Sequence, residues 1–350
     1  MNATTLESFV GQVVSDMAAS LSAVMTDVGS KLGLYKAMAG AGPISAAELS
    51  KKTSTHERYV REWLNNQAAG GYVRYLAETD RYVLPDEHAM VLANEESPVY
   101  MAGGLGVNEA MWIGEDKITD AFRTGKGIGW GEHHHSLHTA TEYFYRTGYR
   151  AHLVSTWIPA LEGVLEKLQS GANVADVGCG HAASTILMAE AFRRSTFWGF
   201  DFHAESIRTA RSRAAEAHVS ERTRFDVASA TNCPGVGYDL ICFMDCFHDL
   251  GDPLGAARHA RETIAEDGTV LLVEPFAGDT VEANLNPVGR LFYAASTAIC
   301  TPNSLSQDVG AGLGAQAGEA RIRTIFAEAG FRTFRRAAQT PFNLILEARP

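Results

Sequence analysis

Three absences narrow the function of this sequence before any motif is considered. No stretch approaches about 18 consecutive apolar residues, so we expect no membrane span. The five cysteines are odd in number and form no C-x-x-C pair, which favours reduced thiols in a cytoplasmic protein over a disulfide framework or a zinc site. The N-terminus lacks the basic start of a secretory signal and carries Glu7 and Asp16 instead.

Positive charge is also scarce. The chain has 30 Lys and Arg against 41 Asp and Glu, and this net charge of −11 disfavours nucleic acid as a partner. Apolar residues are plentiful, at 46% of 350 residues, which is enough for folded cores. At about 100–200 residues per domain, this length predicts two domains.

Residues 1–92 are predicted to form a winged-helix dimerisation domain. Ser45 with Glu48, and Ser54 with Glu57, have the spacing of capping boxes at helix starts. The helix expected over residues 55–69 is followed by two short strands around a turn at residues 78–80. This plan is shared by DNA-binding domains, but acidic residues lie among the arginines and leave no basic face.

The first predicted helix has one apolar face. Residues at helical spacing form this stripe, namely Val10, Val13, Val14, Met17, Leu21 and Met25. Such a face needs a partner, and the first domain is small. We therefore expect a homodimer formed through the N-terminal region.

Residues 93–165 are expected to form a helical linker that also caps the substrate. Their glycine-rich interruption at residues 123–131 does not match a phosphate-binding loop. A run of imidazoles follows, at His133, His134, His135 and His138. Adjacent side chains point apart, and no carboxylate or cysteine spacing completes a site, so we assign no metal ligand.

From residue 166 the pattern predicts a parallel sheet covered by helices. Short apolar runs begin at residues 173, 196, 223, 238 and 269, and amphipathic stretches lie between them. Two further runs, from residues 331 and 343, are joined by a segment too short for a crossover helix, so they should pair antiparallel. The predicted fold class is α/β, a seven-stranded Rossmann-like sheet behind an α-rich winged-helix domain.

A glycine-rich loop follows the first of these strands. Gly178 and Gly180 allow a tight turn and close approach of a ligand to the backbone. Asp201 ends the second strand, where a carboxylate accepts hydrogen bonds from ribose hydroxyls. A nicotinamide or flavin site has similar glycines. Asp176, however, would crowd a pyrophosphate and suits a cationic amino-acid ligand.

The run from Asp176 through Gly178 to Gly180 resembles the first motif of the class I S-adenosylmethionine-dependent methyltransferases. With the winged helix in front, the chain also resembles the two-domain O-methyltransferases and a closer bacterial group. The resemblance implies S-adenosylmethionine as the cofactor. Its methionine part would lie on those three residues, its ribose on Asp201 and its adenine beside Phe202.

The resemblance has two departures. Ala182 replaces the third glycine of the motif, and Ser229 stands where the family usually has an aspartate for the adenine amine. The other residues expected to border the cofactor are Cys179, Ala230, Asp245, Cys246 and Phe247.

His248 and Asp249 follow the fourth strand and resemble the His-Asp pair of the O-methyltransferases, in which the histidine deprotonates the acceptor hydroxyl. Glu274, at the end of the fifth strand, is expected to orient His248 or to face the cofactor. An acidic rim of strand-end side chains is thus predicted, comprising Asp176, Asp201, Asp245, Asp249 and Glu274.

The acceptor site is less defined by sequence. Trp112, Asn286, Phe292 and Tyr293 could form walls for an apolar or aromatic acceptor, or simply pack between domains. We predict methyl transfer to a small-molecule acceptor, a hydroxyl on an apolar or aromatic compound. An NAD(P)-dependent oxidoreductase and a ligand-sensing DNA-binding regulator with a non-catalytic cofactor domain are the alternatives.

Overall fold

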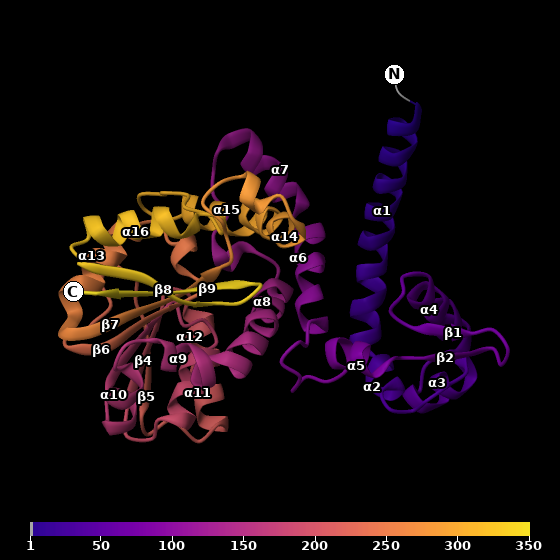
Figure 1. The fold of residues 1–350 in the computed structure, drawn as a ribbon, viewed down its shortest axis with the longest axis horizontal. Helices are drawn as coiled ribbons and strands as arrows, with labels where there is room; N and C mark the ends of the chain where they lie inside the picture. Colours follow the sequence, from indigo (N-terminus) through magenta and orange to yellow (C-terminus); the bar gives the residue numbers. More distant parts are fainter. Residues whose placement is uncertain (1–2) are drawn as a thin grey trace. The chain divides into compact units, whose positions relative to one another are not determined.

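The computed structural model describes residues 3–350, and the chain divides into two compact units (Figure 1). One comprises Met1–Ile113 with His135–Thr147, and the other comprises Gly114–His134 with Gly148–Pro350. The segment 93–165, which we expected to be a separate linker and cap, is shared between them. The domain boundaries derived from the sequence stay predictions.

The first unit is helical with one small hairpin, as the sequence predicted. The hairpin strands β1 (Arg74–Leu76) and β2 (Arg81–Val83) pair antiparallel, and Ile44 bridges to Tyr82 beside them. The helices are α1 (Ala3–Lys31), α2 (Leu34–Met38), α3 (Ala46–Thr53), α4 (Glu57–Ala69), α5 (Asp86–Leu92), the 3-10 turn η1 (Ala102–Gly106), α6 (Val107–Ile113) and α8 (His135–Gly148).

One of the two predicted capping boxes is present. Ser45 accepts a hydrogen bond from the backbone of Glu48, and the Glu48 carboxylate accepts one from the backbone of Ser45. The second box is wrong. Ser54 instead ends α3 in a left-handed conformation, so α4 begins later and is capped by His56, whose ring accepts from the backbone of Arg58.

The arginines of α4 are engaged in ion pairs along the helix. Arg58 pairs with Glu62, and Arg61 pairs with Glu57 and also reaches Asp80 on the hairpin turn. The charges of these two guanidinium groups are therefore compensated locally.

The predicted stripe on α1 is exposed over most of its length. Met17 and Leu21 are 62% and 69% exposed, and Leu6, Phe9, Val10, Val13, Val14 and Val24 are exposed as well. Nearer its C-terminal end the helix is anchored, because the Trp63 indole donates to the Met25 carbonyl at 2.7 Å. Exposed apolar side chains on one face of a helix mark a contact surface.

By length and composition alone, α1 is also apolar enough to cross a membrane over Thr4–Lys31, with a mean hydropathy of 1.2. The criterion of consecutive apolar residues did not detect this helix, because polar residues are interspersed in the window. The same test is passed by soluble helices and by signal sequences, so it is weak evidence. The expectation of no membrane span stays a prediction.

The second unit contains the seven-stranded sheet, in the order β5-β4-β3-β6-β7-β9-β8. The first five strands of this sheet in chain order, β3 to β7, are parallel, and the last two pair antiparallel, so the predicted fold class is confirmed. The strands are β3 (Asn173–Val177), β4 (Thr196–Asp201), β5 (Thr223–Val227), β6 (Tyr238–Met244), β7 (Ile264–Pro275), β8 (Thr333–Gln339) and β9 (Asn343–Arg349).

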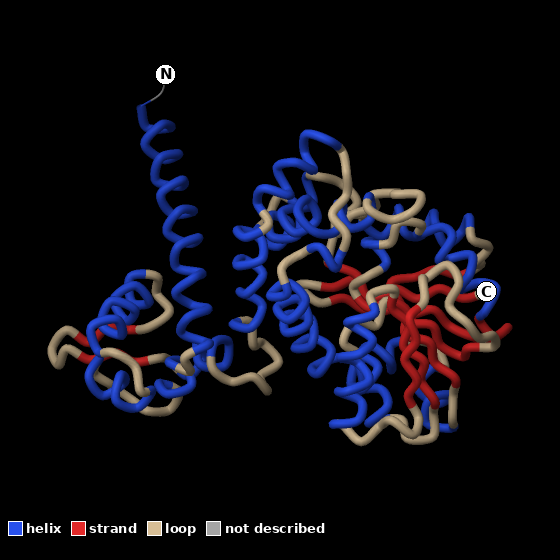
Figure 2. Tube along the Cα trace, turned by 180° about the vertical axis from the view of Figure 1, so that it is seen from behind, coloured by secondary structure: helices blue, strands red, loops and turns tan. Residues whose placement is uncertain are grey.

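Helices cover both faces of this sheet, shown as the red strands between blue helices in Figure 2. One layer contains α10 (Val164–Ser170), α11 (Ala183–Ala191) and α12 (Ala204–Glu216), and the other contains α13 (Pro253–Thr263) and α16 (Gly318–Glu328). Phe326 of α16 is fully buried against Phe247 and Phe331, and forms the centre of the core on its face.

The remaining segments of this unit are short and helical. They are α7 (Glu115–Thr124), η2 (Trp130–Glu132), the π-helix η3 (Tyr149–Trp157), α9 (Ile158–Ala160), the 3-10 turns η4 (Phe247–Asp249) and η5 (Glu282–Asn284), α14 (Pro287–Ala295), the π-helix η6 (Ser296–Cys300) and α15 (Thr301–Leu305). The insertion after β7 therefore folds into helices at the carboxyl side of the strands.

Candidate functional site

The chain order of the sheet reverses between β3 and β6, and ligands of open α/β sheets bind beside the carboxyl ends of such strands. The glycine loop leaves β3 at this point. Its backbone is pinned to the neighbouring strand, since the N–H groups of Gly178 and Cys179 donate to the Phe200 carbonyl. The predicted loop is therefore held rigidly at the switch point.

Each glycine of the loop has a different reason to be there. Gly178 and Gly180 both have positive φ, at 74° and 53°. A Cβ on Gly178 would lie 2.6 Å from the Cys246 sulfur, whereas one on Gly180 would meet nothing within 4 Å. Gly178 thus permits close packing of two strand-end loops, and Gly180 borders open space that a ligand can enter.

Ala182, the departure from the third glycine, also adopts positive φ, at 65°. Its side chain is fully buried, and it stands at the N-cap of α11. An L-residue in this region costs about 1–2 kcal/mol, so the surrounding fold holds the loop in the shape that a glycine would adopt freely.

Asp176 is fully buried beneath the loop. One carboxylate oxygen accepts hydrogen bonds from Ser184 and Thr185, at 2.7 and 2.6 Å, and the other has no partner among the described residues. Burial raises the pKa of this carboxyl, opposed by the two hydroxyl donors. An unsatisfied buried oxygen below a glycine loop fits a cationic or water-mediated ligand contact.

Asp201 ends β4 on the other side of the loop. Its two oxygens accept from the backbone of Gly180 and of His203, at 2.9 and 2.8 Å. Burial raises the pKa of this carboxyl, and these backbone donors oppose the shift. The adjacent Phe202 side chain is 47% exposed, as a surface for a stacked ring requires.

Ser229 uses its hydroxyl locally. It shares a hydrogen bond with the Thr231 hydroxyl and accepts from the Thr231 backbone. Ala230 is partly buried against the core of the sheet. If Ser229 serves the adenine amine in place of the family's aspartate, that contact has to replace part of this turn.

Asp245 follows β6 in a left-handed conformation, with φ 52°. Its two oxygens accept hydrogen bonds from the Tyr149 hydroxyl and the Asn343 amide, each at 2.8 Å. All three side chains are buried. Burial raises the pKa of Asp245 well above its ordinary value, and the Tyr149 hydroxyl opposes that shift.

Sequence reasoning missed Tyr149 and Asn343. Tyr149 looked like one more aromatic residue on a helix, and Asn343 looked like the first residue of a strand. Only the antiparallel return of β9 beside β7 brings Asn343 to the strand-end rim. The π-helix that begins at Tyr149 is the single local signal, since such segments concentrate at functional sites.

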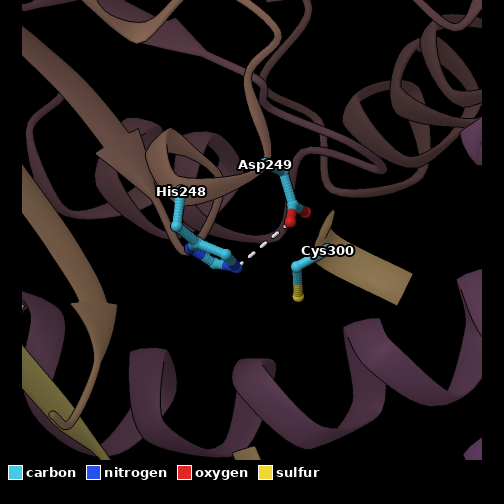
Figure 3. Close-up of side chains that lie close together, drawn as sticks. All are labelled: His248, Asp249 and Cys300. Carbon is cyan, nitrogen blue, oxygen red and sulfur yellow. Dashed lines mark ion pairs between the residues drawn. The ribbon is translucent and has the colours of Figure 1, made fainter. Parts of the chain in front are cut away.

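His248 lies in the turn η4 and is buried between carboxylates. Glu274 accepts from or donates to its Nδ1 at 2.7 Å according to protonation, and also accepts from the Phe247 backbone at 3.0 Å. Asp249 lies 3.2 Å from its Nε2 (Figure 3). The residue that orients the imidazole is therefore Glu274, and Asp249 faces the opposite nitrogen.

Burial alone would lower the pKa of His248, but Asp249 and Glu274 together raise it well above its ordinary value. Asp249 has a raised pKa because it is buried, with His248 opposing that shift. The predicted acidic rim is thus present around His248, where Glu274 and Asp245 also interact electrostatically. Such a rim attracts cationic groups.

Other predicted residues have packing or capping roles in the structure. Phe247 is fully buried in the core, and the Cys246 thiol donates to the Val177 carbonyl at 3.1 Å. Cys179 is buried under Gly199. Asn286 caps α14, accepting from the Gly289 backbone at 2.9 Å.

The expected acceptor walls belong to both units, and their joint role stays a prediction. Phe292 is buried and Tyr293 is partly exposed on α14, within the second unit. Trp112 belongs to the first unit, where it is 66% exposed.

Comparison with known families agrees with this geometry. Residues 149–314 match the family model of a methyltransferase domain, and residues 19–94 match an Rv2258c-like winged helix-turn-helix domain. A search of curated proteins finds no match.

Solved structures resemble the whole chain. An O-methyltransferase family protein from Burkholderia thailandensis is 15% identical, with a TM-score of 0.70 and coverage of 100% of this chain and 98% of that one. Human N-acetylserotonin methyltransferase with bound SAM is 17% identical, with a TM-score of 0.67 and 97% coverage of both chains.

An O-methyltransferase of neocarzinostatin biosynthesis, solved with SAM and 2-hydroxy-5-methyl naphthoic acid, is 17% identical, with a TM-score of 0.60 and coverage of 96% and 97%. At such identities these structures establish the fold.

Proposed function

We propose that this chain, with its winged helix-turn-helix domain and its methyltransferase domain, transfers a methyl group from S-adenosylmethionine to a hydroxyl of a small apolar or aromatic molecule. The observation that carries the proposal is the pairing of a glycine loop at the sheet's switch point with a buried His248–Glu274 pair at the same rim. One provides a place for the cofactor and the other a base beside it.

The residues present fit the cofactor. Asp176 has an unsatisfied buried oxygen, Gly180 borders open space and Phe202 offers an exposed ring. Asp176 would hold the methionine part, Gly180 would lie beside the sulfonium and Phe202 beside the adenine. Asp201 would hold the ribose. When bound, S-adenosylmethionine supplies an electrophilic methyl group on a positively charged sulfur, and the acidic rim favours that charge.

His248 is the proposed general base. Glu274 fixes the ring by holding Nδ1, so Nε2 is the nitrogen available for an acceptor proton. The carboxylate beside Nδ1 also stabilises the imidazolium that forms when the proton arrives. Asp249, which raises the pKa of His248, must swing away from Nε2 so that the imidazole can lose its proton and an acceptor hydroxyl can reach it. Most of the rate enhancement comes from holding the two reactants in line.

The acceptor class is inferred from the chain and its relatives together. Phe292 and Tyr293 lie on α14 in the helical insertion after β7, and they supply apolar contacts. The neocarzinostatin enzyme was solved with a hydroxynaphthoic acid, which is a hydroxylated aromatic compound. A hydroxyl on an aromatic ring is therefore the first acceptor to test.

The test uses purified protein, isotopically methyl-labelled S-adenosylmethionine and a panel of hydroxylated naphthoates, indoles and quinones. Labelled product is expected from wild type, and His248→Ala should reduce turnover by about 10²–10⁴-fold while S-adenosylhomocysteine still binds. Near wild-type turnover in His248→Ala would reject the base. Stabilisation by NAD but not by S-adenosylhomocysteine in a thermal-shift assay would instead favour the oxidoreductase alternative.

The exposed face of α1 is the proposed dimer contact. A second copy of the same helix offers a matching apolar stripe, and two-fold symmetric association buries both. Light scattering should give a dimer at micromolar concentration. Met17→Glu should give a monomer, whereas Glu7→Gln should leave the dimer intact. A wild-type monomer would reject the proposal.

A DNA-binding regulator is the second candidate function, because residues 19–94 match a family model of winged helix-turn-helix domains. The local ion pairs of Arg58 and Arg61 oppose it. A salt titration of DNA binding tests this candidate, since a true phosphate contact surface gives an affinity that falls steeply with salt.

The free cysteines in the described chain support a cytoplasmic location.

A further inference from the structure

Three side chains of types that can bind metal ions converge at His248, the proposed general base. His248 and Asp249 come from the turn η4, and Cys300 comes from the end of the π-helix η6 (Figure 3). One ligand atom from each residue, the imidazole nitrogen, a carboxylate oxygen and the thiol sulfur, lies within 4.8 Å of the other two. His248 and Cys300 are 2% and 6% exposed.

We propose that His248, Asp249 and Cys300 bind a zinc ion, and that zinc occupancy reversibly inhibits methyl transfer by taking the Nε2 that serves as the base. The inhibition rests on the proposed function, whereas the binding does not. Nothing in the sequence pattern indicated the site, because Cys300 is far from His248 along the chain.

The distances suit tetrahedral zinc. Zinc bonds of about 2.0–2.3 Å place adjacent nitrogen and oxygen ligands about 3.4 Å apart. The observed separation of Nε2 from the Asp249 oxygen is 3.2 Å. The sulfur, within 4.8 Å of the other two ligand atoms, would move closer by at most about 1.2 Å to complete three ligands. One position then stays open, as in catalytic zinc sites.

The carboxylate oxygen also faces the imidazole across a contact that a metal ion can bridge. Oδ1 of Asp249 is buried, and its ion-pair partner in the described chain is Nε2 of His248 at 3.2 Å. With both ring nitrogens protonated, His248 faces Glu274 through Nδ1 and the Asp249 oxygen through Nε2. A metal ion that takes the place of the Nε2 proton would be bound by both atoms.

The surroundings complete the pattern of a zinc site. Metal-bound histidines usually donate their second ring N–H to a carboxylate, as His248 can to Glu274 at 2.7 Å. The mixed nitrogen, oxygen and thiolate donors suit zinc or cobalt rather than magnesium or calcium. The negative rim offsets part of the cost of burying a divalent cation.

Cobalt(II) reports on the site without any knowledge of the acceptor. Metal-free protein is titrated with Co²⁺, because thiolate coordination gives a charge-transfer absorption and tetrahedral geometry gives intense visible bands. We expect one equivalent to bind, with zinc displacing it. Cys300→Ser should abolish the charge-transfer band and weaken zinc at least tenfold. Cys233→Ser, which removes another buried thiol of the same unit, should change neither.

Several results would overturn the site. These are no saturable Co²⁺ spectrum, a spectrum unchanged in Cys300→Ser, or one lost equally in Cys233→Ser. Retained stabilisation by S-adenosylhomocysteine shows that each variant is folded. In the activity arm, zinc should inhibit wild type at least tenfold more strongly than Cys300→Ser. Equal inhibition of both refutes the regulatory claim, while absence of turnover in every protein refutes the proposed function and leaves the cobalt titration to judge the site.

Discussion

Tyr149→Phe tests whether the buried contact of Asp245 holds the strand-end rim together. The substitution removes one hydroxyl and little else, because the ring remains in contact with Trp157. Asp245 then keeps only the Asn343 donor, at 2.8 Å. A buried polar group left without its partner costs about 1–3 kcal/mol. For a unit of this size, a loss of about 2 kcal/mol lowers Tm by about 4–8 °C.

The effect should depend on pH in a defined direction. The Tyr149 hydroxyl lowers the pKa of Asp245, so its removal raises that pKa further in the folded state. A raised folded pKa contributes stability that is present at low pH and lost as pH rises through it. The deficit of Tyr149→Phe should therefore grow from acidic toward neutral pH.

The assay is unfolding followed by calorimetry or fluorescence from acidic to neutral pH, and Tyr293→Phe is the matched control. The control removes a hydroxyl that is only partly buried, in the same unit. A Tyr149→Phe protein as stable as wild type, or a deficit that shrinks as pH rises, would refute the reasoning. A double-mutant cycle with Asn343→Ala should show coupling above about 0.5 kcal/mol, because both donors share one carboxylate.

Two other perturbations follow from the structure. Ser45→Ala should destabilise the first unit by about 1 kcal/mol through loss of the capping box. Ser54→Ala should lower the free energy of unfolding by less, because Ser54 caps no helix start. Equal destabilisation of the two variants in urea unfolding would contradict this. Gly178→Ala should lower stability because its Cβ would clash with Cys246. Gly180→Ala should cost only about 1–2 kcal/mol of backbone strain, yet it should still weaken S-adenosylhomocysteine binding. Unchanged affinity of Gly180→Ala by calorimetry would show that the ligand lies elsewhere.

The strands were accessible from sequence because each is defined by a local run of apolar side chains. All seven predicted runs became strands of one sheet, and the short connection before residue 343 correctly predicted an antiparallel pair. The glycine loop was accessible for a similar reason, since its turn needs positive φ within a few residues. The false capping box at Ser54 shows the limit of such local patterns, because a left-handed helix end satisfied that serine's backbone first.

The sequence by itself determined that Asp176, Asp201 and His248 lie at the carboxyl ends of neighbouring strands, because a strand's end is set by its own residues and parallel strands end at one edge. Only the tertiary structure decided what those side chains touch. Tyr149, Asn343 and Cys300 reach the rim from segments separated along the chain by 96, 98 and about 50 residues from their partners. Their positions depend on how helices and a returning strand pack against the sheet, and no local pattern encodes that packing.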